Sequence, residues 1–428
     1  MCDTNSASPV IFCLNDAFIS VPCGMIHNEV LKMDQGHLVL STARIPRGTC
    51  KLFGAIKALS TIKKSVILVH GPKGCVYHIN YIMGMRGDRP SEIYTTCLDE
   101  HDVIFGAEPK LISAIEELDR TLQPELMFVL SCCTSCIIGE DVDRAVNDAR
   151  TKSRAIAISA GGFEGDFHDG YSETLCQLVE QLVHTPDRIR SCSVNLIGML
   201  RAGPDLAELR RMLGLIDVKV NAVLTADATR EDLERLGEAA LNIVLCEPSG
   251  KEAAVLLQTL CGTPYIIEEI PIGYNSTILF LERVAENLNI PAPVFQAGQE
   301  LIPDIDSFRN RRIAIVSGPT RAVSMARYLA EFGVSPRLVV VDFDSNVQEK
   351  IKCLIHPSGE VLIEPCHELI VQKLKEHAID LLIGGMLEQP IANTLGIEHI
   401  DMMHGSQKTV GFAGARNLLH MLCRKDRI

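Results

Sequence analysis

Three cysteines lie where a predicted strand or turn gives way to a helix, a place where side chains can bind a ligand. Cys75 closes the turn HGPKGC, Cys133 lies in SCCTSCIIGED, and Cys50 lies in RGTCKLFGAIKAL. Thiolates from separate segments can share an iron–sulfur cluster, because the ligands of a cluster need not be paired in sequence. The glycines of HGPKGC would let backbone approach such a bulky ligand. These residues therefore indicate a cluster site in the first third of the chain.

Each of these motifs also has a simpler interpretation. HGPKGC could be an ordinary turn between a strand and a helix, and Cys50 could merely begin a helix. The pair Cys133-x-x-Cys136 could be half of a zinc site or a redox-active dithiol. A zinc site needs a second pair at suitable spacing, and the sequence has none. The GxxxxGK[ST] phosphate loop is also absent from the sequence.

Two further candidates follow predicted strands nearer the C-terminus. Cys246 comes directly after the strand in LNIVLCEPSG, and His404 follows the strand in HIDMMHG. In open α/β sheets, ligands bind beyond the carboxyl ends of the strands. An imidazole titrates in the range useful for proton transfer, although a lone histidine is more often structural. Catalytic and metal-binding roles for His404, and a metal-binding role for Cys246, are hypotheses at this point.

Two other segments leave alternatives open. Glu100, His101 and Asp102 could supply protons, or they could be the solvated first turn of a helix. The segment GGFEGDFHDGY (161–171) could be a glycine-hinged lid over a substrate, or a surface connection.

The elements that must position these residues repeat one theme, a short β-branched run followed by a turn and a helical stretch. Strands that alternate with helices predict parallel sheets with right-handed crossovers. The predicted strands are 65–69, 126–130, 155–159, 194–198, 222–225, 242–245, 265–268, 313–316, 338–342, 361–364, 381–383 and 399–402. The clearest helical pattern is EPKLISAIEELDRTL at 108–122.

A chain of 428 residues is too long for one ordinary core. Polar or proline-rich segments at 184–193 and 289–312 precede fresh strand–helix series. We therefore predict an α/β protein with three doubly wound, Rossmann-like domains and mainly parallel sheets. The predicted domains are 1–188, which carries the cluster cysteines, 189–300 and 301–428.

Composition limits the classes of partner. A net charge of −13 argues against a nucleic-acid-binding surface, which needs clustered basic residues. The first twenty residues lack the basic start and apolar core of a signal peptide, and no apolar run is long enough to span a bilayer. We expect a cytoplasmic protein with no membrane partner. A reducing cytoplasm does not sustain a disulfide framework, so the sixteen cysteines raise the expectation of metal binding.

Taken together, four motifs resemble the nitrogenase component 1 family. They are the C-x-x-x-GA series at Cys50, HGPKGC at 70–75, TTCLDEHDVIFGAEPKL at 95–111 and SCCTSCIIGEDV at 131–142. The likeness covers essentially the whole chain and implies three such domains around a central cavity. It implies Cys50, Cys75 and Cys133 as ligands of a 4Fe-4S cluster near a subunit interface. Cys246 and His404 resemble the two protein ligands of the nitrogenase metal cofactor.

Within that family, the sequence most resembles the NifD-like (CfbD-type) subunit of nickel-sirohydrochlorin a,c-diamide reductive cyclase. The supporting phrases include YHINYI, SAGGFEG and MHGSQKTVGFAGARNL. This resemblance implies a homodimer that receives electrons from a separate NifH-like, ATP-hydrolysing iron–sulfur reductase. It implies a nickel tetrapyrrole as substrate, in the biosynthesis of coenzyme F-430. Another nitrogenase-like reductase and a non-catalytic cofactor-assembly scaffold are the alternatives. The fourth iron ligand is left open among Cys132, Cys136, an acidic side chain and a residue of the neighbouring subunit.

Overall fold

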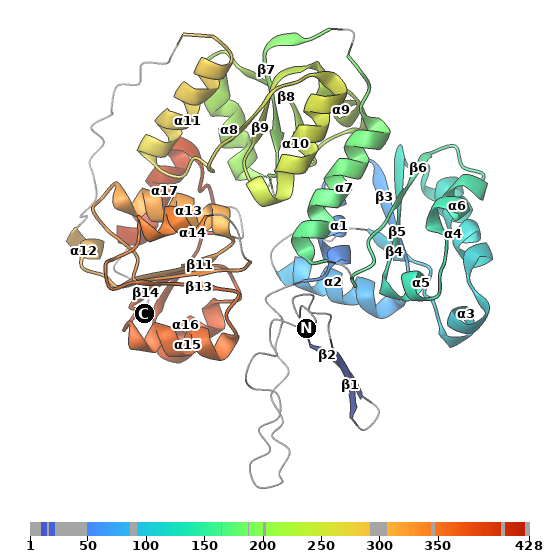
Figure 1. Ribbon diagram of the computed structural model, residues 1–428, viewed down its shortest axis with the longest axis horizontal. Helices are drawn as coiled ribbons and strands as arrows, with labels where there is room; N and C mark the ends of the chain where they lie inside the picture. Colours follow the sequence, from blue (N-terminus) through green and yellow to red (C-terminus); the bar gives the residue numbers. More distant parts are fainter. Residues whose placement is uncertain are drawn as a thin grey trace, which may run out of the picture.

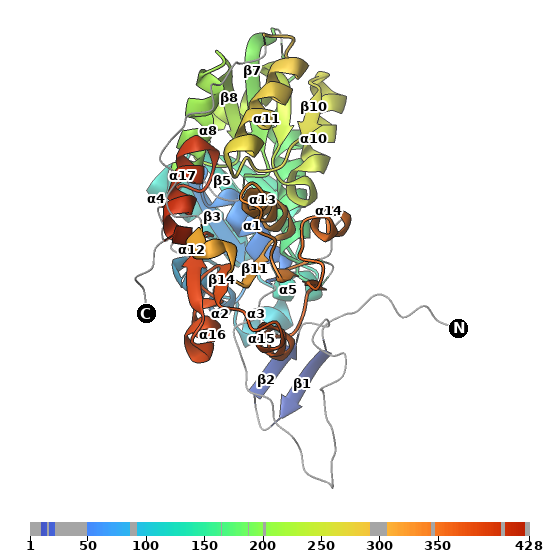
Figure 2. The same ribbon diagram turned by 90° about the vertical axis from the view of Figure 1, so that its left-hand side faces the viewer.

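The computed structural model describes residues 10–14, 17–21, 49–85, 92–163, 165–186, 188–199, 203–291, 306–343, 347–403 and 407–423. Three lobes surround the middle of the molecule, each with its own parallel sheet (Figure 1). An antiparallel hairpin of β1 (Val10–Leu14) and β2 (Ala17–Val21) projects away from them (Figure 2). None of the helices in these ranges combines the length and apolar character that crossing a bilayer requires.

The first lobe holds a four-stranded sheet in the order β4-β3-β5-β6, with every pair parallel. The central strand β5 is buried along its whole length, because helices cover both faces of the sheet. The elements are α1 (Lys51–Leu59), β3 (Ser65–His70), α2 (Lys73–Met85), β4 (Ile93–Thr95), α3 (Glu100–Phe105), α4 (Glu108–Leu122), β5 (Leu126–Ser131), α5 (Cys133–Ile137), α6 (Val142–Asp148), β6 (Arg154–Ile158) and α7 (Phe167–Leu182).

The second lobe holds a parallel sheet in the order β10-β9-β7-β8. Helix α10 has an extended Cys246 as its N-cap and Gly262 as its C-cap, where the positive φ of 72° suits glycine. The elements are β7 (Arg190–Ile197), α8 (Pro204–Gly214), β8 (Lys219–Leu224), α9 (Arg230–Glu234), η2 (Leu236–Glu238), β9 (Ala239–Val244), α10 (Glu247–Cys261), β10 (Tyr265–Ile267) and α11 (Tyr274–Asn287).

The third lobe holds a five-stranded parallel sheet in the order β13-β12-β11-β14-β15. The elements are α12 (Asp306–Arg309), β11 (Ile313–Ser317), α13 (Pro319–Ala330), β12 (Leu338–Val341), α14 (Gln348–Lys352), β13 (Glu360–Ile363), α15 (His367–Glu376), β14 (Leu381–Gly384), α16 (Gln389–Leu395), β15 (Glu398–Asp401) and α17 (Gly411–Cys423). Helix α17 joins the core of this lobe and also packs against α8 and α11 of the second lobe.

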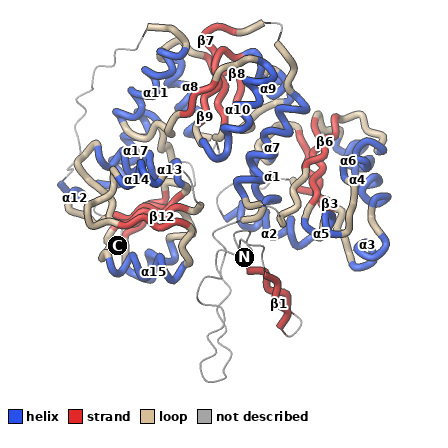
Figure 3. The backbone as a smooth tube through the Cα atoms, in the orientation of Figure 1, coloured by secondary structure: helices blue, strands red, loops and turns tan. Residues whose placement is uncertain are grey.

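Helix α7 ties the first two lobes together. It packs against α1 in the first lobe and against α10 in the second (Figure 3). One continuous apolar core therefore runs from Leu130 of β5 through Leu175 and Leu178 of α7 to Ala254 of α10. The predicted boundary at 188/189 separates two sheets, but the two lobes share a core across it.

The predicted α/β architecture is confirmed, with three Rossmann-like parallel sheets. All twelve predicted strands are present, each with its ends within a few residues, and the helix at 108–122 is α4. The prediction missed the short edge strand β4 and the hairpin β1–β2. The exact domain limits 1–188, 189–300 and 301–428 stay a prediction.

The strand orders mark where ligands are expected. A doubly wound sheet has a switch point between two neighbouring strands whose connections leave in opposite directions, and ligands bind beyond it. In the first sheet this point lies between β3 and β5, in the second between β7 and β9, and in the third between β11 and β14.

Candidate functional site

Cysteines gather beyond the switch point of the first sheet. Cys75 follows β3, and Cys132 and Cys133 follow β5, so the two strands that flank this point both lead to thiols. Cys50 joins them as the N-cap of α1, with an extended backbone. Sequence alone could predict this group because each member directly follows a strand or begins a helix.

The cysteine side chains lie close together: a Cβ at Gly162 would lie 3.2 Å from Cys133 Sγ and 3.4 Å from Cys50 Cβ. Burial, together with the negative charge of the nearby Cys132, Cys50 and Cys133 thiolates, raises the pKa of Cys75 to about 11, and burial is the larger cause. Burial likewise raises the pKa of Cys133, against a hydrogen bond that lowers it. Thiolates this close repel one another, and metal cations are what ordinarily offset such repulsion. The donor set thus has the chemistry of a metal–thiolate site.

Glycine backbone approaches these sulfurs closely. The Gly162 N–H donates to Cys133 Sγ at 3.3 Å. A Cβ at Gly71 would lie 2.5 Å from Cys132 Sγ, and one at Gly161 would lie 2.5 Å from Cys136 Sγ. Only glycine fits beside either sulfur, so side chains are excluded and backbone N–H groups can reach them. Such N–H groups tune an iron–sulfur cluster when it is bound.

Two more glycines fix where Cys50 lies. A Cβ at Gly54 of α1 would lie 2.0 Å from Phe167 O, and one at Gly170 of α7 would lie 2.0 Å from Lys51 O. The two helix backbones therefore touch, and Cys50 at the start of α1 forms an isolated antiparallel bridge with Asp166. Cys50 is thereby held against the N-terminal end of α7.

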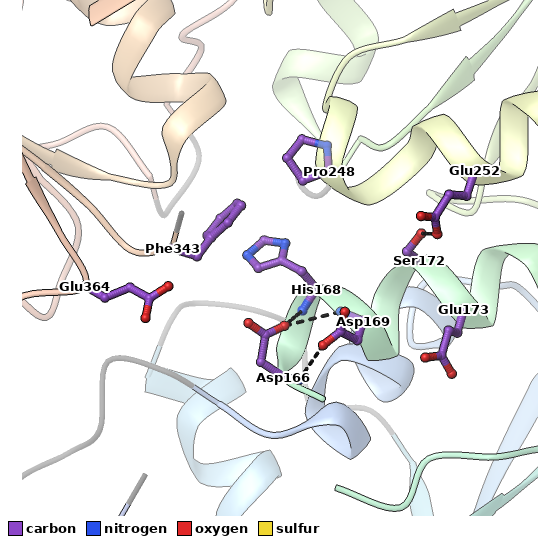
Figure 4. A pocket seen from close by; sticks show the side chains of 9 residues that line it. All are labelled: Asp166, His168, Asp169, Ser172, Glu173, Pro248, Glu252, Phe343 and Glu364. Carbon is purple, nitrogen blue, oxygen red and sulfur yellow. Dashed lines mark hydrogen bonds between the residues drawn. The ribbon is translucent and has the colours of Figure 1, made fainter. Parts of the chain in front are cut away.

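That end of α7 also lines a pocket of about 440 Å³ between the three lobes (Figure 4). Its lining comes from the start of α7, from α10, and from the ends of β12 and β13. The residues are Asp166, His168, Asp169, Ser172, Glu173, Pro248, Glu252, Phe343 and Glu364. A concave site at a junction of domains is a typical place for a ligand, and the lining here is mainly polar, with only Pro248 and Phe343 apolar among these nine residues.

Most of the pocket's carboxylates already have partners. Asp166 and Asp169 form the capping box of α7, in which Asp166 Oδ1 accepts from His168 N at 2.7 Å (Figure 4). Glu252 accepts from Ser172 Oγ at 2.9 Å, and Glu173 pairs with Lys51 at 2.6 Å. These contacts reduce the negative potential that a bound molecule meets.

His168 is the pocket residue with the richest chemistry. Its ring lies against Phe343, with ring centroids 3.5 Å apart, and its Nδ1 is 3.3 Å from Ser249 Oγ. Burial lowers the pKa of His168, opposed by Asp166, Asp342 and Asp169. His168 lies within the segment 161–171, which was a candidate from sequence, but the residue itself was not predicted. Its only local signal was a histidine two residues after the helix-capping Asp166.

Cys246 lies within hydrogen-bond reach of this histidine's partner. Its buried thiol donates to Ser249 Oγ at 3.4 Å, at the switch point of the second sheet. His404 lies outside the described residues, so its placement relative to Cys246 stays a prediction. The metal-binding roles predicted for both also stay predictions.

Several local expectations need correction. Cys75 lies in the first turn of α2 rather than in a loop, because the helix begins at Lys73 directly after Pro72. Cys133 and Cys136 lie in the short helix α5. Residues 167–171 form the first turn of α7, so they are no part of a lid. Glu100, His101 and Asp102 need no correction, because they begin α3, which was one of the two alternatives for them, and Asp102 completes a capping box there.

No three His, Cys, Asp or Glu side chains within the described ranges gather tightly enough to hold a single metal ion. The zinc alternative for Cys133 and Cys136 therefore gains no third ligand there. A cluster makes a different demand, because each of its irons takes its own thiolate.

Comparison with known proteins identifies the family. The model of the nitrogenase component 1 type oxidoreductases matches residues 50–425, which begin at Cys50 and include helix α17. The chain belongs to the nitrogenase component 1 type oxidoreductase family. Within it, the chain is 28% identical over 395 residues to the nitrogenase iron-molybdenum cofactor biosynthesis protein NifE of Clostridium pasteurianum, covering 87% of this chain and 86% of that protein.

A second kind of relative has a similar degree of likeness. The nitrogenase molybdenum-iron protein beta chain of Methanothermobacter marburgensis is 25% identical over 445 residues, covering 92% of this chain and 96% of that one. A solved structure titled "Nitrogenase Cp1 at pH 6.5" superposes with a TM-score of 0.78 at 19% identity, over 90% of this chain and 95% of that one. This structural likeness supports the nitrogenase-like fold.

Proposed function

We propose that this protein is the catalytic subunit of a nitrogenase-like reductase that carries electrons from a 4Fe-4S cluster to a substrate in the three-lobe pocket. The observation that carries this proposal is the bridge between Cys50 and Asp166. Through it, a cluster cysteine lies directly beside a residue that lines the pocket. A short path between donor and acceptor is what a reductase needs.

In this proposal Cys50, Cys75 and Cys133 hold the cluster, whose chemistry is one-electron transfer. Cys132 is the leading candidate for the fourth iron site, because its thiol is buried and acts on the pKa of both Cys75 and Cys133. Cys136, which is exposed, an acidic side chain and a residue of a second subunit are the alternatives.

We propose a nickel tetrapyrrole, nickel sirohydrochlorin a,c-diamide, as the substrate. The reaction would be a multi-electron reduction of the ring coupled to closure of an acetamide side chain into a lactam, a step toward coenzyme F-430. The pocket offers features that suit one edge of such a molecule. Carboxylate oxygens of Glu252 and Asp169 can accept hydrogen bonds from acetamide N–H groups, and the Phe343 ring offers a flat apolar contact.

We propose that the protein acts in the cytoplasm as a homodimer, with a NifH-like, ATP-hydrolysing iron–sulfur protein as its electron donor. Large apolar side chains lie exposed beside the cysteine site. Tyr77 is 72% exposed two residues after Cys75, Ile137 is 70% exposed next to Cys136, and Phe163 is 43% exposed next to Gly162. Exposed apolar side chains that cluster in this way are typical of protein contacts.

The test is anaerobic turnover. The full chain would be incubated with a NifH-like partner, ATP, reductant and nickel sirohydrochlorin a,c-diamide, and the tetrapyrrole absorbance would be followed. We expect an absorbance change that requires both ATP and the partner. The product mass should exceed that of the substrate only by the hydrogens gained on reduction, because the acetamide nitrogen stays in the lactam ring. An unchanged tetrapyrrole with a partner that reduces the cluster would refute this substrate. If dinitrogen, a thioether or protochlorophyllide is reduced instead, the protein is another nitrogenase-like reductase.

A non-catalytic scaffold for metal-cofactor assembly is the second candidate. The similarity to NifE proteins, named for cofactor biosynthesis, favours it. In that case Cys246 and His404 would grip a cofactor precursor, and the protein would bind metal in excess of its cluster without turnover. Iron content measured beside turnover separates the two functions.

A further inference from the structure

A hydrogen-bonded chain of side chains crosses the junction of the three lobes and ends at the pocket. Thr320 Oγ1, at the start of α13, donates to Cys246 Sγ at 3.5 Å. Cys246 Sγ donates to Ser249 Oγ at 3.4 Å, and Ser249 Oγ lies 3.3 Å from His168 Nδ1. Thr320 belongs to the third lobe, Cys246 and Ser249 belong to the second, and His168 belongs to the first.

This chain has the composition of a proton path. A hydroxyl or thiol can donate and accept at once, and so can an imidazole, with one nitrogen for each role. Cys246 and Ser249 are buried, so the middle of the path is shielded from water. Within the part of the chain that the structure describes, His168 Nε2 has no hydrogen-bond partner, whereas Nδ1 contacts Ser249. Nε2 is therefore the nitrogen available to a molecule in the pocket.

Resting on the proposed function, we propose that His168 gives a proton to the tetrapyrrole as it is reduced, and that Ser249 and Cys246 replace that proton. In this step the Nε2–H bond breaks and a bond forms from that hydrogen to the substrate atom that has received an electron. The Ser249 hydroxyl proton moves to Nδ1, and the Cys246 thiol proton moves to Ser249 Oγ. Solvent restores the thiol proton by way of the Thr320 hydroxyl, and the NifH-like partner supplies the electron.

The contact with Phe343 holds the ring for this task. The two rings are tilted by 40° at a centroid distance of 3.5 Å, so the imidazole cannot turn freely. The first turn of α7 fixes the other end of the side chain, because the His168 N–H donates to Asp166 Oδ1. His168 thus lies two residues from the Asp166 that bridges Cys50, which brings electron and proton delivery to the same end of α7.

This proposal assigns Cys246 a task other than metal binding, and the two roles are separable. A serine at position 246 keeps a group that passes protons but is a poor ligand for iron. Cys246→Ser should therefore retain most of the turnover and all of the bound iron, whereas Cys246→Ala should lose turnover and keep iron. A fall in metal content in both variants would mean that Cys246 is a ligand and would overturn its place in the path.

The principal experiment measures His168→Gln and Ser249→Ala as full chains with the NifH-like partner, ATP and nickel sirohydrochlorin a,c-diamide. His420→Gln, at an exposed position of α17, is the matched control. We expect kcat to fall by about 100-fold or more in His168→Gln with little change in KM, because general acid catalysis contributes about 10²–10⁴-fold. Reduction of the cluster by the partner, followed by electron paramagnetic resonance, should be unchanged. Imidazole added to His168→Ala should restore turnover, which a purely structural role would not allow.

The possible outcomes distinguish failure of the proton path from failure of the proposed function. Wild-type turnover with unimpaired His168→Gln and Ser249→Ala would overturn the proton path and leave the proposed function intact. A rise in KM without a fall in kcat, and no rescue by imidazole, would make His168 a binding residue and overturn the path. Absence of turnover in the wild type with a reduced cluster would overturn both proposals.

Discussion

The contact between α1 and α7 can be broken by a single methyl group at Gly170. A Cβ there would lie 2.0 Å from Lys51 O, and real Cβ contacts are essentially never under 3.0 Å. The helices would have to separate by about 1 Å or more, and the obstacle is backbone, which cannot rotate aside as a side chain can. Cys50, the residue before Lys51, would move with α1.

The cost of Gly170→Ala follows from two opposing effects. Overpacking costs roughly 1–3 kcal/mol, and a backbone clash lies at the upper end of that range. Alanine gains up to about 1 kcal/mol over glycine within a helix, so the net loss of stability is about 2 kcal/mol. For a domain of this size that lowers Tm by roughly 4–8 °C. The displacement of Cys50 should also reduce the iron bound per chain.

Anaerobic thermal unfolding and iron analysis of the purified variant measure both effects. Gly84→Ala is the matched control, because Gly84 is an exposed helical glycine of α2 with nothing within 4 Å of the added Cβ. That variant should equal or slightly exceed the wild-type Tm. If Gly170→Ala melts no lower than Gly84→Ala and holds full iron, the close approach of α1 and α7 does not position the cluster cysteine.

Three further predictions concern the cluster and the core. Replacing Cys50, Cys75 or Cys133 with serine should sharply lower the iron content, whereas the control Cys353→Ser should keep it. Iron and sulfide analysis of the purified variants measures this. Tyr328→Phe should cost about 1 kcal/mol in urea unfolding, because the buried hydroxyl donates to Ala415 O at 2.6 Å and this hydrogen bond would be lost, while Ala415 O stays within helix α17. Burial raises the pKa of Asp119, but hydrogen bonds from Ser153 and its neighbour outweigh it and leave the pKa lowered. The ionised Asp119 therefore stabilises the fold at pH values above the pKa of this carboxyl in the unfolded chain. This stabilisation is lost as the pH falls through the pKa in the folded protein, so in Asp119→Asn the free energy of unfolding should fall less steeply with acidification.

Sequence reasoning succeeded where one segment carries its own signal. Most of the twelve predicted strands are short apolar runs. The pattern is continuous in β5, β11, β12 and β14 because these strands are buried along their whole length, whereas β10 and β13 are only half-buried. The edge strand Ile93–Thr95 was missed because three residues are too few to show a period, and the strand exists only by pairing with β3. Cys50, Cys75 and Cys133 could be singled out because each stands near an element's end, and their role as cluster ligands stays a prediction.

The pocket could not be predicted in the same way. His168, Ser249 and Thr320 are separated by 81 and 71 residues in the sequence, and no spacing rule relates them. They meet because α7 packs against α10 of the second lobe and because Thr320, which follows β11, contacts Cys246, which follows β9. The glycines that bring α1 and α7 into contact have no local signature either, since a helical glycine alone looks only like a weak helix former.

The central claim, that electrons pass from the cysteine-bound cluster to a tetrapyrrole in the pocket, is tested most directly in a single turnover. The cluster would first be reduced anaerobically by the NifH-like partner and ATP, and the partner would then be removed. Nickel sirohydrochlorin a,c-diamide would be added while the cluster signal is followed by electron paramagnetic resonance. The account predicts that the cluster signal decays as the tetrapyrrole absorbance changes, with the same rate constant. A cluster that stays reduced beside an unchanged tetrapyrrole would contradict it.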